Sequence, residues 1–330
     1  MIDIFNLQPN KVSTNLNQYT MMMTGDSGVG KTTEMFNFLT SIAPEGKVPL
    51  FLEFEDRFAN IPGIVAIKIN TMQELKKVFN QLRIPKAKDI YSCVVIDTID
   101  KFEEFCKQYE VDKTGVQILK DVGPYGEGEE RYKSHLPAVI GNIQRLGFIV
   151  HGISQTNTKK DFDTKIKSEE TKLKTSTFNY FREAAYMIGY MWKDEKTGDR
   201  YVTFKRTINY PHLKDCFNLP DKIKTTELKE VWEKAIEDMG EANITNDVTI
   251  DKEVKQEHTF DEVMEQLKTF GSLLFDNGYG EDAMIILKKN LGTDADGNVI
   301  SYDTLTEAQI EAAKVIELEL EELVDKYNLK

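Results

Sequence analysis

The glycine-rich segment Gly25–Thr32, with the sequence GDSGVGKT, constrains this chain more than any other feature. It matches the spacing G-x-x-x-x-G-K-[ST], in which glycines let backbone amides turn inward around phosphate oxygens. An apolar run, Tyr19–Thr24, precedes it, and Lys31–Ile42 follows with apolar residues at helical spacing. The dipole of that helix also faces the anion. The segment therefore predicts a phosphate-binding loop between a strand and a helix.

The chemistry of this loop assigns roles to its residues. Lys31 is expected to reach the β and γ phosphates of a nucleotide, and Thr32 to bind Mg²⁺. The predicted ligands are therefore ATP and Mg²⁺. The predicted nucleotide-binding residues of the loop are Gly25, Asp26, Ser27, Gly28, Val29, Gly30, Lys31, Thr32 and Thr33.

Two later strand-like segments end in acids. Val94–Asp97 is an apolar run closed by a carboxylate, so Asp97 is predicted to hold Mg²⁺ as a Walker B acid, a role compatible with its capping the next helix. In the segment Phe51–Asp56, Glu53 and Glu55 fall on one face by the period of two. They are interpreted as site residues that orient water, and the alternative is a solvated strand end.

Strand-like and helix-like segments alternate over the first 225 residues. This pattern predicts an α/β fold with a mainly parallel sheet covered by helices on both faces. Residues 112–128 are rich in glycine and predict a long loop. Residues 156–177 are polar, with no apolar period, and predict a mobile loop. The Lys-Thr-Gly-Asp tip within 193–199 predicts a hairpin.

The net charge of −13 is unevenly distributed. Residues 226–330 carry −16 and residues 1–225 carry +3, so the acidity belongs to an appendage. We expect an ATPase core over 1–240, a linker over 241–258 and a small all-α module over 259–330. The three cysteines are widely spaced and indicate a reducing, cytoplasmic setting. No run is long enough to span a membrane, and no secretion signal is evident.

Taken together, residues 15–225 resemble the RecA-like ATPases, and specifically the phage-type, core-only RecA relatives of the Sak-type single-strand annealing class. The chain differs from RecA in that Lys205 and Arg206 are adjacent rather than two residues apart. The resemblance rests on the ordered motifs GDSGVGKT, FLEFED, VVIDT, IVHGISQTN and KRTINYP.

This resemblance implies a set of roles. Glu55 would be the catalytic glutamate, and Gln155 would sense the γ-phosphate and couple it to a DNA-binding loop. Either Lys205 or Arg206 would act at a neighbouring subunit's ATP site. The loop 112–128 would correspond to a first DNA-binding loop, and the second is 156–177. Its implied DNA-binding residues are Lys159, Lys160, Lys165, Lys167, Lys172 and Lys174.

The implied function is ATP-dependent binding of single-stranded DNA in phage-type recombination or annealing, with DNA-stimulated hydrolysis between subunits of a ring or filament. The protein would work in the cytoplasm of the host. The acidic module is interpreted as a docking domain, for example for a single-stranded DNA-binding protein, as a decoy that competes with DNA, or as a solubility tail.

Three alternatives stay open at this point. The lysines of 156–177 fit a solvated loop, because nearby acids leave the segment only slightly basic. The P-loop also suits a motor or kinase that acts on a non-DNA substrate. It suits equally an interaction module that binds ATP without hydrolysing it.

Overall fold

The computed structural model describes residues 9–55, 60–160, 167–245, 259–294, 297–306 and 309–329. The chain forms two compact units, Met1–Lys252 and Glu253–Lys330, and each is described by itself.

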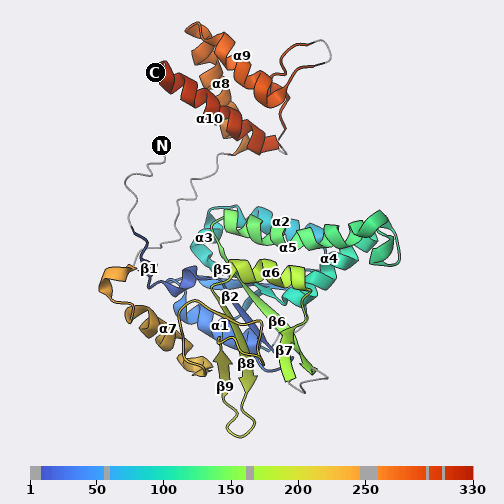
Figure 1. Cartoon of the computed structure of the whole chain (residues 1–330), viewed down its shortest axis with the longest axis vertical. Coiled ribbons are helices and arrows are strands. Elements are labelled where there is room, and N and C mark those ends of the chain that lie inside the picture. Colours follow the sequence, from blue (N-terminus) through green and yellow to red (C-terminus); the bar gives the residue numbers. More distant parts are fainter. Residues whose placement is uncertain are drawn as a thin grey trace. The chain divides into compact units, whose positions relative to one another are not determined.

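The first unit is built on a mainly parallel sheet (Figure 1). Its strand order is β11-β9-β8-β2-β6-β5-β3-β4. The P-loop strand β2 (Met21–Gly25) lies between β6 (Ile149–Lys160) and β8 (Met187–Lys193), parallel to both. On the far side of β6 follow β5 (Tyr91–Asp97), β3 (Val48–Glu53) and β4 (Val65–Lys68). Since parallel strands end at the same edge, the ends of β2, β3, β5 and β6 converge there.

Helices cover both faces of the sheet (Figure 1). One core contains Met22, Val94 and Ile96, and the other contains Met21, Met23 and Val95, so neighbouring residues of a strand enter opposite layers. The first layer is covered by α2 (Met72–Leu82), α3 (Lys86–Ile90), α4 (Ile99–Thr114), α5 (Glu127–Arg145) and α6 (Thr175–Ala184). The second is covered by α1 (Lys31–Ile42) and α7 (Leu228–Glu237). This arrangement confirms the predicted α/β fold, with a mainly parallel sheet covered by helices on both faces.

The polar segment 156–177 differs from its prediction. Instead of a mobile loop, β6 continues to Lys160 and pairs antiparallel with β7 (Lys167–Thr171), and α6 begins at Thr175. The two strands are held together by hydrogen bonds between their backbones. They can therefore form without the regular spacing of apolar residues on which the prediction depended. The loop predicted over 112–128 is also shorter, because α4 runs to Thr114 and 3₁₀ turns fill the gap before α5.

A second hairpin follows the prediction. Strand β8 turns at residues 194–199 into β9 (Arg200–Thr203), which pairs with it antiparallel. Beyond β9, β11 (Ile223–Lys224) extends the sheet and β10 (Lys214–Asp215) pairs with β8.

The end of the first unit corrects the predicted linker. Strand β12 (Ile244–Thr245) pairs parallel with β1 (Val12–Ser13), so residues 241–245 of the predicted linker are part of this unit. The second unit packs α8 (Phe260–Asp276), α9 (Gly280–Leu291) and α10 (Ile310–Lys326) around their own apolar core. Among the described residues, no helix is long and apolar enough to cross a membrane.

Candidate active site

The P-loop wraps around the amino group of its own lysine. Lys31 Nζ donates to the carbonyl oxygens of Gly25 and Asp26, at 2.9 and 2.8 Å. Burial lowers the pKa of Lys31, while Asp100, Asp97 and Glu55 nearby oppose that shift. Glycine is required at the loop's first position, because Gly25 has φ +146° and an added Cβ would lie 2.4 Å from the Met191 carbonyl oxygen.

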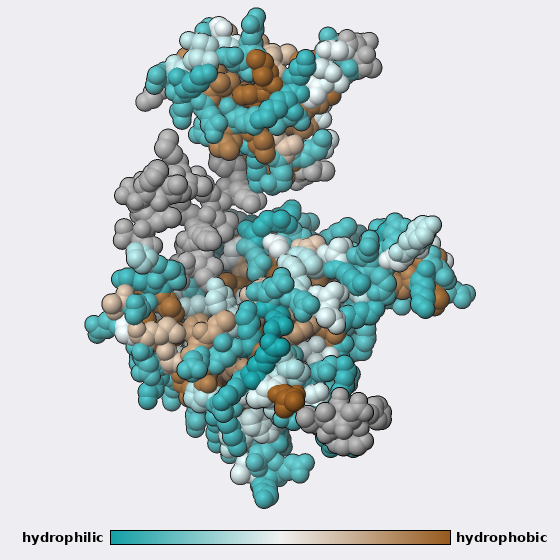
Figure 2. Space-filling model, viewed as in Figure 1, coloured by the Kyte–Doolittle hydropathy of each residue, from teal (hydrophilic) through white to brown (hydrophobic). Residues whose placement is uncertain are grey.

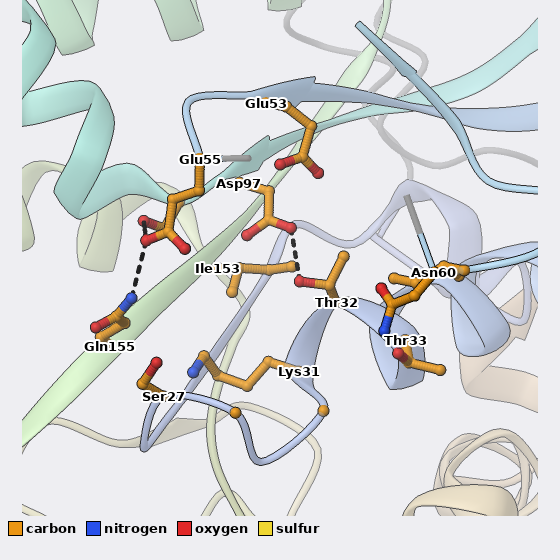
Figure 3. A pocket seen from close by; sticks show the side chains of 14 residues that line it. Ser27, Lys31, Thr32, Thr33, Glu53, Glu55, Asn60, Asp97, Ile153 and Gln155 are labelled. Carbon is orange, nitrogen blue, oxygen red and sulfur yellow. Dashed lines mark hydrogen bonds between the residues drawn. The ribbon is translucent and has the colours of Figure 1, made fainter. Parts of the chain in front are cut away.

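The predicted metal ligands are brought together at the end of β5. Thr32 Oγ1 donates to Asp97 Oδ2 at 2.7 Å (Figure 3). A hydroxyl and a carboxylate are the hard oxygen ligands that Mg²⁺ prefers, so these two residues fit the role of holding it. When bound beside a nucleotide, Mg²⁺ supplies positive charge to the phosphate oxygens.

Glu53 is the most deeply buried acid of the site. Its side chain is 1% exposed, and its Oε1 has no hydrogen-bond partner among the described residues. Burial, and then the nearby Asp97 and Glu55, raise the pKa of Glu53 to about 9. Both acids predicted to face the site therefore line it, but they differ in environment, since Glu55 is only half-buried just beyond the end of β3.

A chain of side chains leads from Glu55 out of the site. Gln155 Nε2 donates to Glu55 Oε1 at 2.9 Å (Figure 3), and Thr98 Oγ1 donates to the same oxygen at 3.3 Å. On its other side, Gln155 Oε1 accepts from Lys172 Nζ at 2.6 Å. One amide thus connects the acid of the cavity to a lysine at the base of the β6–β7 hairpin.

These groups enclose a cavity of about 480 Å³. Three P-loop residues predicted to bind nucleotide, Gly25, Asp26 and Val29, support the cavity without lining it. Sequence reasoning missed four of its residues, for which neither spacing nor residue type gave a signal. The cavity is lined by Ser27, Gly28, Gly30, Lys31, Thr32, Thr33, Glu53, Glu55, Asn60, Ile61, Asp97, Thr98, Ile153 and Gln155, of which Asn60, Ile61, Thr98 and Ile153 were not predicted.

Asp100 was also missed, although it supports the site directly. It is 8% exposed, and its carboxylate accepts from Ser154 Oγ at 2.7 Å and from the Gln155 backbone N–H at 2.8 Å. Burial raises its pKa. An acid three residues after Asp97 was the available signal, because the start of α4 lies beside Ser154 and Gln155 of β6.

The predicted DNA-binding lysines contact side chains in different parts of the first unit. On the hairpin, Lys159 pairs with Glu170, and Lys160 stands opposite Lys167. The group also includes Lys174, which pairs with Glu129 of α5 at 2.9 Å and lies 5.3 Å from the centre of the Tyr132 ring. Lys172 is bonded to Gln155 as described, and Lys165 lies outside the described residues.

The basic pair predicted to act on a neighbour lies away from the cavity of its own chain. Lys205 Nζ pairs with Asp221 at 2.6 Å, and Arg206 is exposed. Neither residue lines the cavity. Their assignment to a neighbouring subunit stays a prediction.

Comparison with known proteins gives three findings. Residues 17–212 match the family model described as "AAA domain". The chain is 25% identical over 306 residues to the SPbeta prophage-derived uncharacterized protein YorG of Bacillus subtilis (strain 168), covering 88% of this chain and 90% of that protein. Among solved structures, the RadB recombinase aligns with 60% of this chain and 89% of its own, at 14% identity and a TM-score of 0.33.

Proposed function

The chain belongs to the AAA domain family, and from that premise we propose that this P-loop ATPase is an ATP-dependent single-stranded DNA-binding protein of phage-type recombination or annealing. Its relative in a prophage supports the phage setting. The observation that carries the proposal is the Glu55–Gln155–Lys172 chain, because it joins the nucleotide cavity to a hairpin that carries several exposed lysines.

In the proposed reaction, the P-loop amides and Lys31 bind the β and γ phosphates. Thr32 and Asp97 would hold Mg²⁺. Glu55 accepts a proton from the attacking water, which Gln155 helps to place. The negative charge that develops on the γ-phosphate is stabilised by Lys205 or Arg206 of a neighbouring subunit, as arginine fingers do. Hydrolysis would therefore require a ring or filament.

The same residues offer a route for DNA to influence hydrolysis. A DNA phosphate that binds the Lys172 ammonium would break the hydrogen bond from Lys172 Nζ to Gln155 Oε1. The Gln155 side-chain amide could then rotate toward the nucleotide. Few aromatic side chains lie on the hairpin, so we expect backbone-dominated binding that weakens with salt. The exposed positions of Lys159, Lys160 and Lys167 suit such contacts.

The decisive experiment measures ATP hydrolysis with and without single-stranded DNA, together with particle size. We expect DNA to stimulate hydrolysis in the wild-type protein, and ATP to promote assembly. Lys172→Ala should lose the stimulation while keeping ATP binding. The matched control is Lys229→Ala, which removes a lysine of α7 that donates to the Ser41 carbonyl oxygen and is not among the predicted DNA-binding lysines.

Two results would contradict the proposal. ATP hydrolysis that DNA does not change would favour a motor or kinase with another substrate. Tight ATP binding with negligible turnover, even by assembled protein, would favour a module that uses ATP as a structural ligand.

A further inference from the structure

The β8–β9 hairpin holds the P-loop at both ends. At the first end, Gly25 packs so closely on β8 that an added Cβ would lie 2.4 Å from the Met191 carbonyl oxygen. At the other end, an added Cβ on Gly30 would lie 2.6 Å from Arg200 Nε. Gly30 also has φ +102°, which disfavours other residues there. The loop is therefore fixed between a backbone oxygen of β8 and a guanidinium of β9.

Arg200 makes two directed contacts at this junction. Its Nε donates to the Val29 carbonyl oxygen at 2.9 Å. Its Nη1 donates to Glu34 Oε1 at 3.2 Å, and the Glu34 side chain, in the first turn of α1, is only 11% exposed. Glu34 N–H in turn donates to the Gly30 carbonyl oxygen at 3.0 Å. One guanidinium thus connects the last turn of the loop to the start of the helix.

The backbone that carries Arg200 is itself well held. Arg200 pairs with Lys193 across the hairpin, and Tyr201 beside it pairs with Lys224 of β11. Thr225 Oγ1 donates to the Arg200 carbonyl oxygen at 3.4 Å. The two neighbouring strands therefore fix the backbone from which the Arg200 side chain reaches the loop, and the planar guanidinium limits the entropy lost for each hydrogen bond it makes.

The geometry points to Arg200 as a positioning residue that sets the P-loop in its phosphate-binding conformation. By holding the Val29 carbonyl on the outside of the loop, it leaves the amide of the same peptide unit, the Gly30 N–H, facing inward. Amides fixed in advance bind phosphate without paying for reorganisation. This inference rests on the proposed function only in that the loop must bind a nucleoside triphosphate.

Because the Arg200 guanidinium donates to two acceptors at once, the variants should differ in how much ATP affinity they lose. Arg200→Gln should weaken ATP binding about tenfold, which corresponds to the loss of about 1.4 kcal/mol. Arg200→Lys should lie between this variant and wild type, because an ammonium cannot serve both acceptors as a fork does. Glu34→Gln keeps the bond to Val29 and should weaken binding less. Turnover at saturating ATP should change little in all three variants.

The test is titration of the full chain with an ATP analogue that is not hydrolysed, alongside melting temperature and steady-state kinetics. Arg145→Gln is the matched control, since that arginine bonds to Asn142 on α5. Weaker binding with turnover retained supports the inference. A lower melting temperature with unchanged affinity would overturn it, because Arg200 would then be merely structural.

Two further arms separate the remaining explanations. If Arg200→Gln weakens ATP but not inorganic triphosphate, the side chain contacts the nucleoside and the positioning role is overturned. Equal losses for both ligands support it. If the wild-type chain itself binds neither ligand, the proposed function fails, which is a different result from variants that bind as tightly as wild type.

Discussion

Glu55 and Gln155 are hydrogen-bonded at the end of the cavity where the γ-phosphate is expected, and the proposed function makes Glu55 the group that accepts a proton from water. Replacing Glu55 by Gln keeps an oxygen that can accept from Gln155 but removes the basic carboxylate. We expect turnover to fall by about 10²–10⁴ because general-base assistance is lost. ATP affinity should be retained. Phosphate release and nucleotide titration measure the two effects.

Glu104→Gln provides the control for this change, since that exposed acid pairs with Lys101. Wild-type turnover in Glu55→Gln would contradict the assignment.

His151 gives a pH dependence of stability. It is 1% exposed, its Nδ1 accepts from the Met21 N–H at 3.1 Å, and burial lowers its pKa from 6.5 to about 3. Between these values the unfolded chain binds the proton more tightly than the folded one. The free energy of unfolding should therefore fall as pH drops below about 6.5, with a slope from this group of up to about 1.4 kcal/mol per pH unit.

His151→Asn tests this contribution, because its amide oxygen can still accept from Met21. Denaturant unfolding between pH 4 and 8 should show a shallower acid slope in the variant. The two proteins should keep the same slope above pH 7. Identical slopes below pH 6 would exclude His151 as a source of the acid sensitivity.

At the scale of elements, the P-loop depends on its glycines for different reasons. Gly25 has both a positive φ and the Met191 carbonyl against it, whereas Gly28 has φ +80° and, beyond its two neighbours in the chain, no atom within 4 Å of an added Cβ. Gly25→Ala must move backbone, so it should lower the melting temperature strongly. Gly28→Ala should cost only about 1–2 kcal/mol of backbone strain.

Thermal unfolding without nucleotide separates these two costs, since an added methyl at Gly28 also faces the cavity. The prediction fails if the two variants melt at the same temperature. That result would mean that β8 yields at Met191 and does not hold the loop.

Short sequence patterns predicted the helices, strands and loops whose structure depends on neighbouring residues in the chain. Gly25–Thr32, Asp97 and the alternation of apolar runs were sufficient for the fold, and the sequence motifs as a whole predicted ten of the fourteen residues that line the cavity. The β6–β7 hairpin was not predictable from apolar period, because its strands are held by cross-strand hydrogen bonds between polar residues. Arg200 was missed because its partner Val29 is 171 residues away and its sequence context is an ordinary strand start.

For the whole molecule, the division of charge is as informative as its sum. The first 225 residues carry +3 and the last 105 carry −16. The second unit has its own apolar core, and Figure 2 shows apolar side chains at its surface. Among its described residues, the exposed large apolar ones are Phe275, Met284, Ile285, Val315 and Leu318. An acidic unit with its own core can act either as a competitor of DNA or as a docking domain.

Removing residues 253–330 distinguishes these roles, and the position of the cut matters. A chain that ends at Lys252 keeps β12, which pairs with β1, whereas a cut at residue 240 would remove that strand. If the acidic unit competes for the lysines of the β6–β7 hairpin, the shortened chain should bind single-stranded DNA more tightly at low salt. The gain should shrink as salt rises, because electrostatic competition is screened beyond about 10 Å at 0.1 M.

The deletion of residues 253–330 also needs a measurement that does not depend on DNA. ATP binding by the shortened chain should match that of the full chain, since the described cavity residues all precede residue 156. With ATP binding intact, an unchanged DNA affinity at low salt would exclude competition by the acidic unit. Docking of a partner protein through the exposed apolar residues would then be the better explanation. Leu318→Lys should in that case abolish binding of the partner protein, because the Leu318 side chain is exposed on α10. ATP hydrolysis should not change.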